Sequence, residues 1–155
     1  MSDPIIIADA SPLIALEDIG ELDILHRLYG EILITDLVRN EIHASLPPWI
    51  KISDEYDPQQ KQLLELELDA GEASAIALAI AKQPKRLIID EIKGRSVAKR
   101  LGLSVIGTLG IIILAKEKGV IQSGKLILQK LEQHGFWISA KLKQQIIKRL
   151  KEEDI

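Results

Sequence analysis

The sequence contains no cysteine, which excludes disulfide bonds, thiolate zinc sites and cysteine nucleophiles. A chain without cysteine is compatible with a reducing cytoplasm, where we expect this protein to work. Aromatic residues are also scarce, at 3% of a chain that is 46% hydrophobic. The core must therefore be built almost entirely from isoleucine, leucine, valine and alanine.

The sequence signals of export and membrane insertion are missing too. The chain starts Met1-Ser2-Asp3-Pro4, with no basic segment before its first apolar run, so we expect no signal peptide. No stretch approaches the roughly 18 uninterrupted apolar residues of a membrane helix, so we expect no membrane association. The length of 155 residues favours a single domain over 1–155.

A strong excess of one charge is absent as well. The formal net charge is −3 at pH 7, from 23 acidic and 20 basic residues. Nucleic-acid binders usually carry a basic domain or patch, and this total indicates none. A metal-dependent nuclease is still compatible with the charge, because bound cations reverse the sign of an acidic site.

What the sequence does contain is an alternation of short strands and helices. β-Branched and apolar runs predict strands at 5–8, 32–34, 86–89 and 104–106, with a short extended piece at 49–52. Helices are expected after Ser11-Pro12 and at 21–28, 36–44, 59–68, 71–80, 91–101, 108–118, 124–133 and 140–151. This alternation favours an α/β fold with a mainly parallel sheet.

Four acidic residues fall where such a fold binds ligands. Asp9 and Asp90 each follow a strand, Glu41 lies on the helix after the second strand, and Glu72 lies in the first turn of an alanine-rich helix. Ligands of open α/β sheets bind beyond the carboxyl ends of the strands. Pooled carboxylates without matching Arg or Lys repel one another unless cations lie among them, and Mg²⁺ or Mn²⁺ prefers oxygen ligands.

Each of these acids also has an ordinary structural explanation. Asp9 is placed to cap the following turn, and Asp90 to cap the helix after it. Glu41 is compatible with an exposed helical charge, and Glu72 with a carboxylate that complements a helix dipole. Caps need not converge in space, whereas the strand ends of one parallel sheet open on the same edge, which favours the shared site.

Several segments together resemble the motifs of PIN domains. Asp9 to Ile14 is similar to their opening motif, Gly71 to Ala79 to their central helix, and Ile88 to Glu91 to their third acidic motif. Gly94, Arg95 and Ala98, then 101–103 and 107–110, continue the match, which covers roughly 5–121. The combination is especially similar to the branch that contains VapC toxins.

This resemblance implies a three-layer α/β/α fold with a short, mainly parallel sheet and a Mg²⁺- or Mn²⁺-dependent ribonuclease, the toxin of a toxin–antitoxin pair. Its acids match Asp9, Glu41, Glu72 and Asp90 as catalytic and metal-binding residues, and Ser11 matches a small supporting hydroxyl residue. Many relatives have Asp where this chain has Glu72. Glu91 often appears as a second Asp, which leaves open whether Asp90 or Glu91 faces the metal.

The chemistry that the resemblance implies is hydrolysis of RNA phosphodiester bonds by metal-activated water. RNA also needs positive charge, for which Lys93 and Arg95 are candidates. An ion pair with Glu91, four residues earlier, competes for Arg95. A small antitoxin and a second copy of the chain are the expected protein partners.

The histidine and tryptophan side chains, which could bind a metal or stack on a base, are interpreted as structural. The three histidines, His26, His43 and His134, are too scattered to predict a ligand cluster. Trp49 and Trp137 are expected to cover edges of the core rather than to stack on bases.

Three other functions were weighed against the nuclease. A catalytically silent PIN-like protein-binding module would use the apolar faces of helices 21–28 or 59–68. A phosphoryl-acceptor domain needs paired acids near the first strand and a Lys after the last, but Asp9 has no adjacent acid and Gly107 follows Ile106. An aspartyl phosphatase needs a second Asp where Ala10-Ser11 stands, and no P-loop is present.

Overall fold

The computed structural model describes residues 4–153. Residues 1–3, where no signal peptide is expected, and 154–155 lie outside the described residues. The elements in chain order are β1 (Ile6–Ala8), α1 (Ala10–Asp18), α2 (Asp23–Tyr29), β2 (Ile32–Thr35), α3 (Asp36–Glu41), β3 (Ile50–Ser53), α4 (Pro58–Leu64), α5 (Ala70–Lys82), β4 (Arg86–Ile88), α6 (Ile92–Arg100), β5 (Val105–Ile106), α7 (Thr108–Glu117), α8 (Gly124–Gln133) and α9 (Ala140–Leu150).

The strands form one five-stranded sheet in the order β3-β2-β1-β4-β5 within the described part of the chain. Every pairing is parallel, and Ile7 of the central strand β1 lies between Leu33 of β2 and Leu87 of β4. The predicted α/β fold is therefore confirmed, and the sheet is entirely rather than mainly parallel. All five strands point their carboxyl ends toward the same edge.

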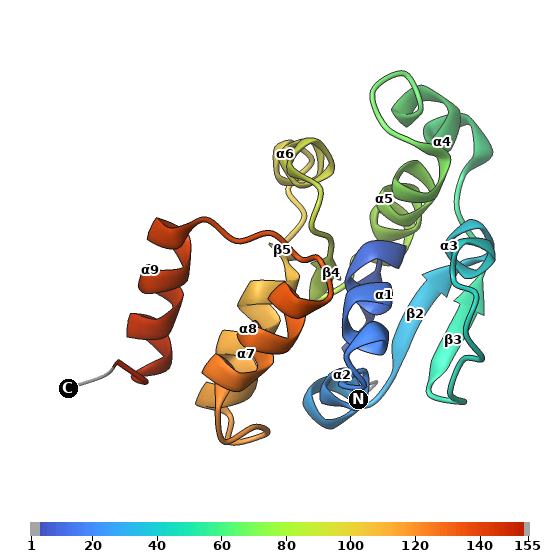
Figure 1. Cartoon of the computed structure of the whole chain (residues 1–155). Coiled ribbons are helices and arrows are strands. Elements are labelled where there is room, and N and C mark those ends of the chain that lie inside the picture. Colours follow the sequence, from blue (N-terminus) through green and yellow to red (C-terminus); the bar gives the residue numbers. More distant parts are fainter. Residues whose placement is uncertain (1–3, 154–155) are drawn as a thin grey trace.

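Helices cover both faces of this sheet in a three-layer arrangement (Figure 1). On one side, α5 packs against β1 and β2 with α4 and α6 beside it. On the other side, α1 and α2 lie next to α7, and α8 and α9 pack on α7 in turn. In Figure 1, α9 and β3 lie at opposite ends of the molecule. None of the helices within 4–153 has the length and hydropathy needed to cross a membrane.

The core is aliphatic, as the composition predicts. In α5 every residue from Gly71 to Ala79 is buried, because alanines on both sides of the helix allow its neighbours to approach closely. Ile76, Leu78 and Ile88 are fully buried within this core. Each such side chain contributes about 1.5–3 kcal/mol of burial free energy. The core thus holds α5 rigidly against the sheet, and with it the residues that begin the helix.

Several local predictions need correction. Helix α3 ends at Glu41 rather than residue 44, and α4 ends at Leu64 rather than residue 68. The apolar face of α2 is not free for a partner, since Leu25 is fully buried within the core. Trp49 is half-buried and stacks on His26 with ring centroids 5.0 Å apart, as a residue at the edge of the core would. Trp137 is 83% exposed, so the same interpretation is wrong for that residue.

Candidate active site

Five carboxylates gather at the carboxyl edge of the sheet. Asp9 follows β1 and Asp90 follows β4, while Glu41 ends α3 and Glu72 lies in the first turn of α5. The fifth is Asp69, the N-cap residue of α5. The charges of Asp69, Glu41 and Asp90 all raise the pKa of Asp9, and that of Asp9 raises the pKa of Glu72. The four predicted acids therefore share one electrostatic environment.

Asp9 is the most deeply placed of these acids, with only 4% of its surface exposed. Burial is the largest cause that raises its pKa from 3.8 to about 7, and the neighbouring carboxylates raise it further. A hydrogen bond from the backbone of Ala10 opposes this shift. Asp9 occupies the N-cap position of α1, but its side chain makes no capping hydrogen bond within the described residues. Capping does not account for this residue.

Glu72 and Asp69 lie side by side at the start of α5. The backbone amide of Glu72 donates to Asp69 Oδ1 at 2.8 Å. Burial first, then a hydrogen bond with Asp69 and its charge, raise the pKa of Glu72 from 4.5 to about 7. Glu72 Oε2 is buried without a hydrogen-bond partner among the described residues. A buried carboxylate oxygen without a partner is costly, so this atom is available to a ligand.

Asp69 is the residue of this site that the sequence analysis missed. Its signal was present, because Asp69 precedes Glu72 by three residues at a helix start, which is the spacing of a capping box. The structure adds that the same carboxylate raises the pKa values of Asp9 and Glu41. Asp69 thus combines a capping role with membership of the acidic cluster.

Glu41 reaches the cluster by lying against the first turn of α5. Its carboxylate occupies the space that a Cβ atom on Gly71 would need. Glu41 is exposed at the surface, yet desolvation by the groups beside its carboxyl and then the charge of Asp69 raise its pKa. The absence of a side chain at Gly71 therefore gives this carboxylate its place beside the other acids.

A chain of buried hydroxyl groups joins α3 to α5. The backbone amide of Val38 donates to Thr35 Oγ1 at 3.0 Å, which caps α3. Thr35 Oγ1 lies 2.7 Å from Ser74 Oγ, and Ser74 donates to the carbonyl of Gly71 at 2.7 Å. Thr35 and Ser74 are both fully buried. This chain fixes the helix that carries Glu41 against the helix turn that carries Glu72.

Asp90 is oriented by Thr108, the first residue of α7. The Thr108 amide donates to Asp90 Oδ1 at 2.7 Å, and its hydroxyl donates to Oδ2 at 2.6 Å. Asp90 thus caps α7 rather than α6, the helix that follows it. Glu91 is exposed, and its charge is not among the causes of the Asp9 pKa shift. Asp90 rather than Glu91 faces the cluster, and Thr108 is a second residue to which no role had been assigned.

Three residues proposed in supporting or RNA-binding roles lie around the cluster. Arg95 makes no ion pair with Glu91 in the described structure; its Nη1 lies 3.4 Å from the Ile89 carbonyl. The expectation of that ion pair is therefore wrong. Lys93 is exposed on α6, on the same side of the sheet as α5. The Ser11 side chain lines a hollow beside Phe136 and has no hydrogen bond to any described carboxylate.

The donor set is chemically suited to a hard divalent cation. Across 4–153, no Lys or Arg lies within 4 Å of any of the five carboxylates; the Arg95 guanidinium and Asp90 both approach Gly107 but form no ion pair. Carboxylate oxygens and the unpartnered Glu72 Oε2 are the ligands that Mg²⁺ and Mn²⁺ prefer. No group of three or more His, Cys, Asp or Glu side chains among the described residues already converges as a metal-binding group. Two of the three histidines have structural contacts, since His26 and His134 each contact a backbone carbonyl at the end of their own helix.

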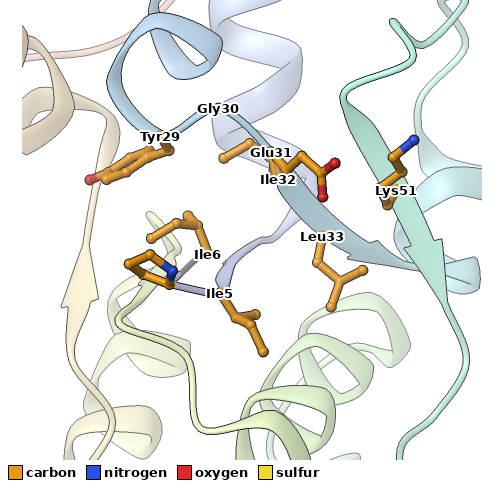
Figure 2. A pocket seen from close by; sticks show the side chains of 9 residues that line it. Ile5, Ile6, Tyr29, Gly30, Glu31, Ile32, Leu33 and Lys51 are labelled. Atoms are coloured by element: carbon orange, nitrogen blue, oxygen red, sulfur yellow. The ribbon is translucent and has the colours of Figure 1, made fainter. Parts of the chain in front are cut away.

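A cavity and a groove on the surface lie at different distances from the acidic cluster. A cavity of about 280 Å³ lies at the opposite edge of the sheet, with Tyr29 and Lys51 at its two ends (Figure 2). None of the five carboxylates of the candidate site lines this cavity. A larger groove of about 630 Å³ has Asp90 and Arg95 in its wall and extends to Trp137 and Arg149. The groove that adjoins the acids is therefore the one on the α9 side of the molecule.

Comparison with protein families agrees with this architecture. A family model described as a PIN domain matches residues 5–152, and the chain belongs to that family. The match extends beyond the region of resemblance seen in the sequence and includes α8 and α9. No curated protein and no solved structure matches the chain. PIN domains are in general nucleases, so the acidic cluster lies in a fold whose members hydrolyse nucleic acid.

Proposed function

We propose that this protein is a metal-dependent ribonuclease whose active site is the acidic cluster at the carboxyl edge of the sheet. The observation that carries the proposal is a group of carboxylates in which Asp9, Glu41 and Glu72 have raised pKa values and no described Lys or Arg forms an ion pair with any member. Such an arrangement is unfavourable in itself and becomes favourable when a cation joins it. RNA is the substrate that a PIN nuclease implies.

Asp9, Glu41, Glu72 and Asp90 are the proposed metal-binding and catalytic residues. A bound Mg²⁺ or Mn²⁺ would lower the pKa of a water molecule and offset the charge that develops on the scissile phosphate. Asp9 and Asp90 are the proposed inner ligands, because they end neighbouring strands β1 and β4. Thr108 holds the orientation of Asp90 through both carboxylate oxygens.

Glu72 is suited to the proton transfer that the reaction needs. In the metal-free protein its pKa is about 7, and its buried Oε2 atom has no hydrogen-bond donor among the described residues, so this atom is free to accept a proton. Asp69 holds the start of the helix by accepting from the Glu72 backbone amide, and it raises the pKa of the Glu72 carboxyl. We assign Glu72 the role of holding or moving a proton at the attacking water. The Glu41 carboxylate, which lies against Gly71, is assigned a supporting role beside it.

The biological role that we propose is that of a VapC-like toxin. This rests on the resemblance of the motifs around Asp9, Glu72 and Asp90 to that branch of the PIN family. It implies a cytoplasmic protein of one domain, over 1–155, whose ribonuclease is held inactive by a small antitoxin protein. Coexpression with a candidate antitoxin should then restore growth that the wild-type chain arrests and that Asp9→Asn does not arrest.

The first experiment is incubation of the pure protein with a mixed pool of single-stranded RNA. Parallel samples contain Mg²⁺, Mn²⁺ or EDTA, together with the variants Asp9→Asn and Asp18→Asn. Asp18 is a matched control, because it is an exposed aspartate at the other end of α1. Cleavage that requires metal, survives in Asp18→Asn and disappears in Asp9→Asn supports the proposal. Cleavage that persists in Asp9→Asn contradicts it.

A catalytically silent protein-binding module is the second candidate. The observation in its favour is the exposed apolar surface at the end of α4 and just beyond it, where Leu63 is 68% and Leu66 is 83% exposed. Exposed leucines of this kind suit a partner protein or a second copy of the chain. Calorimetric titration with Mg²⁺ and Mn²⁺ separates the two: a silent module binds neither metal, whereas the proposed nuclease binds and loses this binding in Asp9→Asn.

A further inference from the structure

The groove of about 630 Å³ beside the acidic cluster is built from segments far apart in the sequence. Asp90 and Arg95 form its end near the proposed active site. The opposite wall comes from the loop between α8 and α9, through Trp137, and from α9, through Arg149. A molecule held in the groove would therefore extend from the acids toward the C-terminal helices.

Trp137 is the unusual residue of this groove. It is one of only two tryptophans in the chain, and its indole is 83% exposed. It does not stand alone, because the same groove is also lined by Ile92, which is 83% exposed, so the two side chains form an apolar surface together. A large flat aromatic face beside a proposed ribonuclease site is suited to stacking on an unpaired base.

The charges of the groove complement a phosphate backbone. The Arg149 guanidinium makes no hydrogen bond or ion pair with any residue that the structure describes. The Arg95 guanidinium has a single long contact, to the Ile89 carbonyl, and lies close to the same backbone position, Gly107, that Asp90 approaches. Two arginines with unused donors are notable in a chain of net charge −3, and Arg binds phosphate through paired donors.

We propose that this groove binds the nucleotides of single-stranded RNA that flank the cleaved bond, with a base stacked on Trp137 and a phosphate held by Arg149. The inference rests on the proposed ribonuclease function and specifies how its substrate is held. It requires RNA with unpaired bases, because both faces of a paired base in a duplex are already stacked. A partner protein in the same groove would use its apolar wall, whereas the Arg149 guanidinium, unpaired among the described residues, favours a ligand with regularly spaced negative charges, as RNA has.

The test is binding of a fluorescein-labelled ten-nucleotide single-stranded RNA, followed by anisotropy with Mg²⁺ present. All variants carry Asp9→Asn so that the RNA stays intact. Trp137→Ala is expected to weaken binding about 5- to 150-fold, since stacking on an aromatic side chain contributes about 1–3 kcal/mol per base. Trp137→Phe should recover most of this loss, because phenylalanine keeps an aromatic face. The matched control is Leu66→Ala, which removes an equally exposed apolar side chain elsewhere and should change affinity less than twofold.

The phosphate contact has its own control on the same helix. Arg149→Gln is expected to reduce the dependence of log affinity on log salt by about 0.7, the value for one phosphate contact to a single strand. Lys148→Gln removes one charge at the adjacent exposed position, which does not line the groove, and should leave this slope nearly unchanged. Equal effects of the two variants would mean that only the general charge of α9 matters, and would overturn the assignment of Arg149.

Cleavage is measured separately with the active protein. Trp137→Ala should raise KM while kcat changes less than about threefold, because stacking remote from the reacting bond binds substrate and transition state alike. If RNA binding depends on Trp137 but the protein cuts no RNA, the proposed ribonuclease function is refuted and the proposed RNA-binding groove is supported. Affinity that is the same in Trp137→Ala as in Leu66→Ala would overturn the groove proposal. The same holds if Trp137→Ala abolishes self-association and leaves RNA affinity intact, which would make the groove a protein interface.

Discussion

The Glu41 carboxylate lies over Gly71, in the space that a Cβ atom on that residue would occupy. The same relationship recurs on α6, where a Cβ atom on Gly94 would be 2.9 Å from Glu72 Oε2. Two glycines on neighbouring helices thus leave room for two of the proposed catalytic carboxylates. Because the displaced atom is the end of a flexible side chain, an added methyl group would move the carboxylate more readily than the backbone.

Gly71→Ala is therefore expected to impair catalysis without impairing folding. The methyl group should push the Glu41 carboxylate out of the cluster and lower kcat about tenfold or more. The free energy of unfolding should change by less than about 1 kcal/mol, since Ala is a better helix former than Gly. Steady-state cleavage kinetics and urea denaturation of the same samples measure both effects. In a Glu41→Gln background the substitution should have little further effect on kcat, and full additivity would contradict the mechanism.

Thr108 provides a second test, because both of its donors go to Asp90. Thr108→Val keeps the shape and the backbone donor but removes the hydroxyl, so we expect kcat to fall about 10- to 100-fold, as for other residues that orient a metal ligand. Thr108→Ser restores the hydroxyl and should recover most of the activity. Calorimetric titration with Mn²⁺ should show weaker binding in Thr108→Val, and a loss of activity with unchanged metal affinity would count against this role.

The positions of the strand-end acids could be predicted because they follow from local pattern and one topological rule. β-Branched runs mark the strands that end before Asp9 and Asp90, and parallel strands open on one edge. Thr108 could not be assigned in this way, since it meets Asp90 from 18 residues away through the packing of α7. Asp69 had only the local signal of a helix cap, which does not indicate an active-site role; its closeness to Asp9 depends on the fold. The exposure of Trp137 depends on the path of the loop after α8, which no periodic pattern encodes.

The hydroxyl chain between α3 and α5 makes a prediction about stability. Thr35→Val removes the cap of α3 and the partner of Ser74 in a fully buried location. We expect the free energy of unfolding to fall by about 1–3 kcal/mol and the melting temperature by about 3–10 °C. Thermal and urea unfolding measure the loss. Ser96→Ala, at an exposed position of α6, should change stability by less than about 0.5 kcal/mol. Equal effects of the two substitutions would show that the hydrogen-bonded hydroxyl groups do not stabilise the contact between α3 and α5.

The raised pKa of Asp9 predicts how stability of the metal-free protein depends on pH. The folded protein holds a proton on Asp9 up to about pH 7, whereas the unfolded chain releases it near its ordinary pKa of 3.8. The folded state therefore binds more protons between these values, and the unfolding free energy contributed by Asp9 falls as pH rises through them and levels off above about 7. Asp9→Asn removes this loss. In EDTA, the variant should melt several degrees above the wild type at pH 8 and close to it at pH 4.

Addition of Mg²⁺ should reverse that order at pH 8. A cation among the carboxylates stabilises their charged forms and binds only the folded state, so it raises the melting temperature of the wild type. Asp9→Asn lacks a proposed ligand and should respond much less, while Asp18→Asn should behave as the wild type in both conditions. Differential scanning calorimetry with and without metal distinguishes these cases. If Asp9→Asn gains as much stability from Mg²⁺ as the wild type, Asp9 is not a metal ligand. The predicted pH dependence of the metal-free protein would be unaffected by that result.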